Sequence, residues 1–101
     1  MINPLEIMKN LENIKTQAEE IKKKLPTIKA TGYAMGNQIE VIVTGEMKIE
    51  SLKIDPALVK EGNSEMLEVL IASAVNNAFE NVRNRLTQEA GQFGQQYGLN
   101  I

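Results

Sequence analysis

The sequence predicts an α+β fold in which a long helix, a three-stranded antiparallel meander, a short helix and a long helix follow one another. Three observations predict it. Apolar residues recur every three or four positions in residues 3–25, every second position in residues 27–54, and at helical spacing again in the C-terminal third. Pro26, Pro56 and Gly62 stand at the boundaries between these stretches. The 101 residues are enough for one domain with one modest core.

The first helix has a clear start and a clear end. Asn3 can cap it, Pro4 fits the first helical position, and Glu6 stands where a capping box places an acidic residue. Pro26 ends the helix, because proline lacks the N–H group that a further turn would need. Between these ends the apolar residues form a seam like that of a coiled coil, made of Ile7, Met8, Leu11, Ile14, Ala18, Ile21 and Leu25.

The two-residue alternation of residues 27–54 predicts three strands. Gly36-Asn37 and Gly45-Glu46 each predict a two-residue hairpin turn, which makes the sheet an antiparallel meander. The third strand is expected from Met47 to Ile54. Its apolar phase switches near Glu50-Ser51, and this switch indicates a β-bulge or a local twist.

Two more helices are predicted after the sheet. Asp55-Pro56 repeats the capping pattern of the N-terminus and predicts a short helix through Val59. A long helix follows, capped by Asn63 or Ser64, and the chain is free of Gly and Pro from residue 65 to about 90.

The long last helix changes character along its length. Its first half, from Met66 to Val75, is apolar nearly all round and is expected to be buried. Residues 91–101 are rich in Gly and Gln and are expected to form a flexible tail. The folded domain is therefore predicted to span residues 1–90.

The side chains that the sequence lacks exclude most catalytic chemistry. The chain has no His and no Cys, and Asp55 is its one Asp. Without imidazole or thiolate groups we expect no metal site of the usual kind, no enzyme activity, no cofactor and no small-molecule substrate. No apolar stretch approaches the roughly 20 residues of a membrane span, and the N-terminus lacks the layout of a signal peptide. We therefore expect a cytoplasmic protein with no membrane partner.

The charged residues leave two interpretations open. The formal net charge is −2, and the first 25 residues carry five Lys against four Glu. These lysines can contact phosphates, or they can form ion pairs along the helix such as Glu12–Lys15 and Glu19–Lys23. Likewise Arg83 and Arg85, which lie among several Asn residues, can contact a nucleic-acid backbone or cover the end of an apolar interface.

The length of the last helix predicts a projecting arm. A helix of about 26 residues spans about 39 Å, whereas a strand of about eight residues spans about 26 Å. The helix therefore outruns the sheet, and we expect it to pair with the first helix beyond it. One protomer would leave the apolar seam and a sheet edge uncovered, which favours a symmetric dimer.

Four pieces of the sequence stand at the joints of this order of elements. They are Asn3-Pro4 with Met8-Lys9-Asn10; Ala30-Thr31-Gly32; the hairpin from Ile39-Glu40-Val41 to Gly45; and Ile54-Asp55-Pro56-Ala57-Leu58, which leads to Glu65-Met66-Leu67-Glu68 and Ala74-Val75-Asn76-Asn77-Ala78. Together, over about residues 3–88, they resemble the YbaB/EbfC family of bacterial nucleoid-associated proteins.

The resemblance implies a cytoplasmic, nucleoid-located homodimer shaped like tweezers. Its arms would contact double-stranded DNA with little base specificity and so modulate chromosome organisation or gene expression. Antiparallel pairing of the two long helices is expected to bring Lys9 and Lys15 to the end of the arm together with the two Arg residues, and to leave Lys22 and Lys23 nearer the sheet. Carried over by position, the candidate DNA contacts are Lys9, Lys15, Lys22, Lys23, Arg83 and Arg85.

A protein-binding scaffold or a prefoldin-like chaperone module is the alternative function. Prefoldin-type subunits also join two long helices through hairpins, and an acidic net charge suits a scaffold at least as well as a DNA-binding protein. DNA binding weakens steeply as salt rises, whereas scaffold binding need not, so a salt titration separates the two functions.

Overall fold

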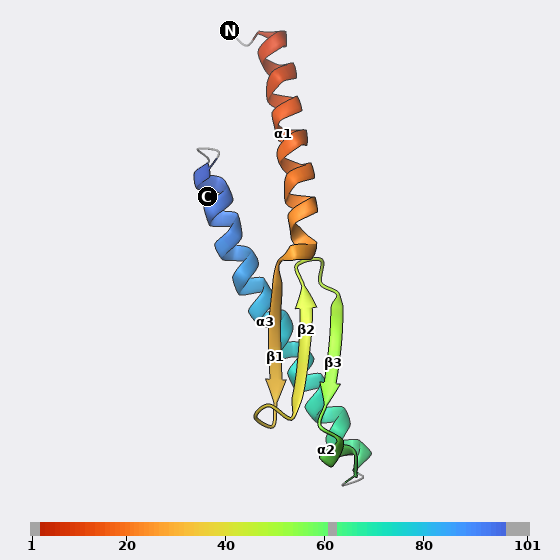
Figure 1. Cartoon of the computed structure of the whole chain (residues 1–101). Helices are drawn as coiled ribbons and strands as arrows, with labels where there is room; N and C mark the ends of the chain where they lie inside the picture. The colour runs from red at the N-terminus through yellow and green to blue at the C-terminus, as the bar shows by residue number, and fades with distance from the viewer. Residues whose placement is uncertain (1–2, 61–62, 97–101) are drawn as a thin grey trace.

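The computed structural model describes residues 3–60 and 63–96 and confirms the predicted α+β order (Figure 1). The elements are α1 (Pro4–Lys24), the 3-10 turn η1 (Leu25–Thr27), β1 (Lys29–Ala34), β2 (Ile39–Thr44), β3 (Ile49–Ile54), α2 (Pro56–Lys60) and α3 (Ser64–Gln96). The chain is elongated, with extents of 70 × 18 × 18 Å. α1 and the C-terminal half of α3 project from the same end of the sheet. No helix within residues 3–60 and 63–96 is long and apolar enough to cross a membrane.

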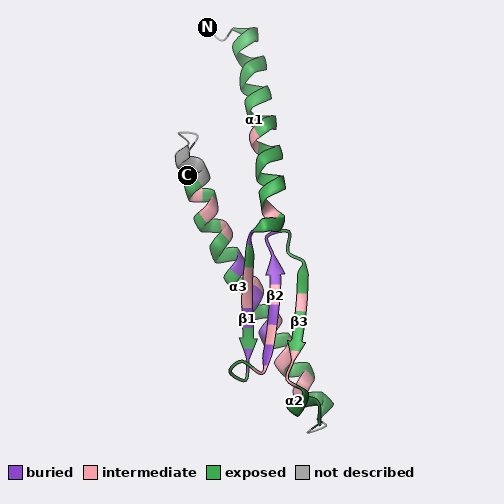
Figure 2. Ribbon diagram, viewed as in Figure 1, coloured by how far each residue is buried: buried purple, intermediate pink, exposed green. Residues whose placement is uncertain are grey.

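α1 starts as predicted and stands almost free of the rest of the chain. The Leu5 N–H donates to Asn3 Oδ1 at 3.0 Å, and Pro4 fills the first helical position. The helix ends in η1, which contains Pro26. No residue of α1 is buried (Figure 2), so the predicted apolar seam faces solvent in the single chain.

The sheet has the order β1-β2-β3, and both strand pairs are antiparallel. Ile39, Val41 and Val43 of the central strand are 0% exposed, as the alternation predicts. The bulge is also confirmed. Ile42 lies opposite Ser51 and Val43 lies opposite Ile49, which leaves Glu50 as the extra residue of β3.

The hairpin turns lie where the glycines predicted them, but the prediction of two-residue turns is wrong. Residues 35–38 join β1 to β2, and both Met35 and Gly36 have positive φ angles. In the second turn the Met47 N–H donates to the Thr44 carbonyl oxygen at 2.9 Å, and Met47 itself has a φ of 63°. Met47 therefore belongs to the turn, because a hairpin turn can end on a residue in the left-handed conformation.

α3 packs on one face of β1 and β2. Ala74, Ala78 and Val82 of α3 are 0% exposed and form one core with the buried side chains of the central strand. The helix backbone lies very close to β1, because a Cβ added to Gly32 would overlap the Ala74 carbonyl oxygen and the Ala78 backbone nitrogen. A glycine on the strand and alanines on the helix thus set the distance between the two layers.

The prediction that the first half of α3 is buried is wrong for the single chain. Val69 is 68% exposed, and Leu70 and Ile71 are only partly buried. A helix that is apolar on all sides needs cover on all sides. One sheet face provides cover on one side only, so a second apolar side of α3 faces solvent.

The prediction that the last helix ends near residue 90 is also wrong, because α3 continues to Gln96. Gly91 and Gly94 lie inside it. Glycine costs a helix about 1 kcal/mol relative to alanine but still donates its backbone hydrogen bond, and glutamine is a good helix former. Residues 91–96 are therefore helical, whereas residues 97–101 of the predicted tail lie outside the described residues.

Candidate nucleic-acid interface

The lysines of α1 are exposed and lie along a helix that extends away from the sheet (Figure 2). Four of them, Lys9, Lys15, Lys22 and Lys23, form no ion pair with another described residue. The predicted pairs Glu12–Lys15 and Glu19–Lys23 are therefore absent from the described part of the chain. The four ammonium groups are available to an anionic partner.

The four lysines fall into two pairs around α1. Lys15 and Lys22 are seven residues apart, which places them about 10 Å apart along one margin of the apolar seam. Lys9 and Lys23 are fourteen residues apart and lie on the side of the helix opposite the seam. α1 thus presents positive charge along two of its sides.

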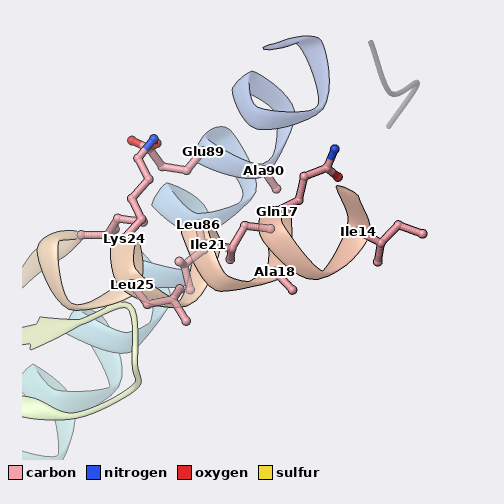
Figure 3. Close-up of a pocket in the computed structure, with 10 residues that line it drawn as sticks. Ile14, Gln17, Ala18, Ile21, Lys24, Leu25, Leu86, Glu89 and Ala90 are labelled. Atoms are coloured by element: carbon pink, nitrogen blue, oxygen red, sulfur yellow. The ribbon is translucent and has the colours of Figure 1, made fainter. Parts of the chain in front are cut away.

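The direction of α1 is fixed at its base by contacts with a turn and with α3. The Gly45 N–H donates to the Leu25 carbonyl oxygen at 3.1 Å and to the Ile28 carbonyl oxygen at 2.8 Å. Lys24 Nζ lies 3.2 Å from Glu89 Oε2 of α3 (Figure 3). These contacts hold the last turn of α1 against the sheet, while the rest of the helix extends from it.

An apolar cavity of about 330 Å³ lies between α1 and α3 above this base (Figure 3). Ile14, Ala18 and Ile21 line it from α1, and Leu86 and Ala90 line it from α3. Apart from one Gln and the Lys24–Glu89 pair, its described lining is apolar.

The expectation that Arg85 lies at the arm end with Lys9 and Lys15 is wrong. Its Nη1 donates to the Lys29 carbonyl oxygen at the start of β1, at 3.1 Å. The cause is the contact of Ala78 with Gly32. Arg85 is seven residues beyond that contact on the helix and Lys29 is three residues before it on the strand, and each span is about 10 Å. Arg85 is therefore held beside the sheet.

Arg83 and Arg85 lie on different sides of α3. The two residues are two positions apart on α3, which separates them by about 200° around the helix axis. Arg83 is exposed, and its guanidinium has no hydrogen bond or ion pair with another described residue. Of the two arginines, Arg83 is the one with all its side-chain donors available.

The sequence interpretation missed the role of two amides on α3. Asn77 and Asn81 are among the Asn residues that surround the two arginines in the sequence, and both bind the backbone of β1. Asn77, Asn81 and Arg85 recur every four residues, so they share one side of α3. That polar spacing beside the apolar stripe was the available signal.

Comparison with known proteins assigns the family. The model of the YbaB/EbfC DNA-binding family matches residues 1–97. A nucleoid-associated protein of Dictyoglomus turgidum is 29% identical over 91 residues, which cover 90% of this chain and 88% of that protein. Another, from Rickettsia rickettsii, is 36% identical over 78 residues, which cover 77% of this chain and 73% of that protein.

A solved structure shares the fold. The crystal structure of the uncharacterized protein HP0035 from Helicobacter pylori matches with a TM-score of 0.76 at 18% sequence identity, and the match covers 91% of this chain and 97% of that one. The order of elements described above is therefore found in a crystallised protein of low sequence identity. Because the family model spans nearly the whole sequence, this chain belongs to the YbaB/EbfC DNA-binding family.

Proposed function

We propose that the protein binds double-stranded DNA as a homodimer, with little base specificity, and modulates chromosome organisation or gene expression at the nucleoid by occupying DNA. The observation that carries this proposal is the set of unpaired lysines on a projecting helix, Lys9, Lys15, Lys22 and Lys23. Lysine contacts to phosphate give affinity without reading sequence. Membership of a DNA-binding family and relatives named nucleoid-associated proteins support the same function.

The proposed contacts differ in how directly they can reach DNA. The four unpaired lysines of α1 and Arg83 have no competing partner among the described residues. Arg85 has one N–H committed to the Lys29 carbonyl oxygen, so it can offer a phosphate only its remaining donors. We therefore propose the four lysines and Arg83 as the main contacts, and Arg85 as a secondary one.

The test is duplex binding measured by fluorescence anisotropy from 50 to 200 mM salt with DNA of unrelated sequences. If about half of the lysines of a dimer engage at once, the log–log slope of affinity against salt should be about −3 to −5. Over this range the Kd should then rise roughly 60- to 1,000-fold, and by similar factors for each sequence. A Kd that salt barely changes, or no measurable binding at 50 mM salt, would contradict the proposal.

The proposed homodimer rests on apolar side chains that the single chain leaves uncovered. Leu11 is 59% exposed, Ile14 is 62% exposed, and Val69 on α3 is 68% exposed. Monomeric proteins rarely expose a large apolar patch such as the α1 seam, and a second copy would cover it symmetrically.

Sedimentation velocity at micromolar concentration is therefore expected to give the mass of a dimer. Replacing Leu11 and Ile14 with Lys should weaken the dimer and leave the helical circular dichroism of the fold intact, because neither side chain is part of the core. Replacing the exposed Glu12 and Glu19 with Lys is a control that changes charge off the seam. A wild-type monomer at every concentration would refute the dimer.

The apolar cavity between α1 and α3 favours a second candidate function, a protein-binding scaffold or a prefoldin-like chaperone module. Its lining and the exposed α1 seam could hold apolar segments of another protein. This candidate predicts that the protein suppresses aggregation of an unfolded model substrate at salt concentrations that abolish DNA binding. If the protein does not suppress aggregation under these conditions, this candidate function is ruled out.

A further inference from the structure

The two edges of the sheet differ in what occupies them. The Gly45 N–H bonds to the Ile28 carbonyl oxygen at 2.8 Å, and this bond fixes which residues of β1 face β2. In an antiparallel pair the backbone groups of alternate residues point toward the neighbouring strand and away from it. The backbone groups of Lys29, Thr31 and Tyr33 therefore point away from β2, along the free edge of β1.

Side chains of α3 occupy one of these outward groups on each of the three residues. The Tyr33 N–H donates to Asn77 Oδ1 at 3.1 Å. Asn81 Nδ2 donates to the Thr31 carbonyl oxygen at 2.8 Å, and Arg85 Nη1 donates to the Lys29 carbonyl oxygen at 3.1 Å. We call Asn77, Asn81 and Arg85 the edge row.

The edge row matches the strand in spacing. Four residues of α-helix advance about 6 Å, and two residues of extended strand advance about 6.6 Å. Successive members of the row therefore meet successive outward residues of β1. The close contact of Gly32 with Ala74 and Ala78 keeps the helix near enough for these short side chains to reach.

Within residues 3–60 and 63–96, no such row lies along the other edge of the sheet, that of β3. The Asp55 N–H donates to the Gln38 carbonyl oxygen at 2.8 Å, which turns the backbone groups of Leu52 and Ile54 away from β2. Among residues 3–60 and 63–96 these outward groups have no hydrogen-bond partner. Among the described residues, polar side chains of α3 therefore occupy outward backbone groups of β1 but not those of Leu52 and Ile54.

We propose that the edge row seals β1 against the addition of a strand from a second copy of this chain. An open edge strand is a template for pairing with another strand, and native proteins block such edges. A second copy could add to β1 only after displacing the three hydrogen bonds of the edge row. The row thus keeps association of the chain finite at this edge, whether or not the protein binds DNA.

The same substitution made at two positions tests the row, because one Asn accepts its hydrogen bond and the other donates it. Asn77 accepts a hydrogen bond, and an Asp there can still accept one. Asn81 donates, and an Asp there would place a carboxylate against the Thr31 carbonyl oxygen. Asn77→Asp is therefore expected to sediment like the wild type, whereas Asn81→Asp should form larger species whose mass rises with concentration.

A pair of matched triple variants tests the row as a whole. Asn77→Ala, Asn81→Ala and Arg85→Ala together should give growing assemblies in sedimentation velocity. The control triple removes the same residue types from exposed positions of α3 outside the row, as Asn76→Ala, Arg83→Ala and Asn84→Ala, and should sediment like the wild type. If the row triple fails to fold, Asn81→Asp against Asn77→Asp decides the question.

Amide hydrogen exchange gives a second measurement. In dilute Asn77→Ala protein the Tyr33 amide should exchange at least tenfold faster than in the wild type, because it loses its acceptor. As concentration rises that amide should become protected again when a second strand covers the edge. Folded row variants that keep the wild-type mass at every concentration, with no reprotection of Tyr33, would overturn the proposal.

Discussion

Gly32→Ala is expected to lower the free energy of unfolding by about 3 kcal/mol or more. The added Cβ would overlap the Ala74 carbonyl oxygen and the Ala78 backbone nitrogen, so it meets backbone that no side-chain rotation can move. α3 would have to move away from β1 and lose contact with the core. Urea unfolding followed by circular dichroism measures the change.

Gly91→Ala is the matched control for this substitution. Gly32 packs against α3, and Gly91 lies within α3. A Cβ added to Gly91 meets nothing within 4 Å. The alanine should stabilise the helix by about 0.5–1 kcal/mol, because glycine is the poorer helix former. Equal changes in the free energy of unfolding for Gly32→Ala and Gly91→Ala would show that the close contact between α3 and β1 does not determine the cost of the added methyl group.

Removing the four unpaired lysines of α1 is expected to abolish most of the salt dependence of DNA binding. The variant Lys9→Ala, Lys15→Ala, Lys22→Ala, Lys23→Ala should bring the log–log slope from about −3 to −5 toward about −1, since each lost phosphate contact removes about 0.9. Affinity at 50 mM salt should fall about 100-fold or more, by similar factors for unrelated sequences. Anisotropy titrations on duplexes measure both quantities.

The control for this variant removes an equal charge elsewhere. Lys29 and Lys53 lie on strands, Lys48 lies in the turn between β2 and β3, and Lys60 lies on α2. Their replacement by Ala should change the slope little. Lys29 and Lys48 form exposed ion pairs with Glu50 and Glu46, whose loss costs little stability. Equal losses in the two variants would indicate that net charge, and not the α1 surface, governs binding.

The sequence by itself determined the elements whose signals are local. Asn3 and Pro4 predicted the start of α1 because a cap needs only its own helix turn. The alternation around Val41 predicted β2 as a strand, and the change of phase near Glu50-Ser51 marked the place of the bulge. It also supplied the resemblance to the family to which the chain belongs.

The lengths of the turns and of α3 needed more than these signals. Glycine marked both hairpins, but Met47 occupies a left-handed position that residue type alone does not predict. Gly91 and Gly94 suggested a tail, although glycine without proline does not stop a helix. Such preferences are small in energy, so the surrounding structure decides their outcome.

Only the tertiary structure decided which polar residues of α3 are free. Arg83 and Arg85 have similar surroundings in the sequence. The close contact of Ala78 with Gly32 places Arg85 at the edge of β1, whereas Arg83 is exposed to solvent. Likewise, periodicity marked Val69 as apolar but not as uncovered. The physical reason is that periodicity specifies the sides of a helix, whereas the register of one close backbone contact specifies what each side meets.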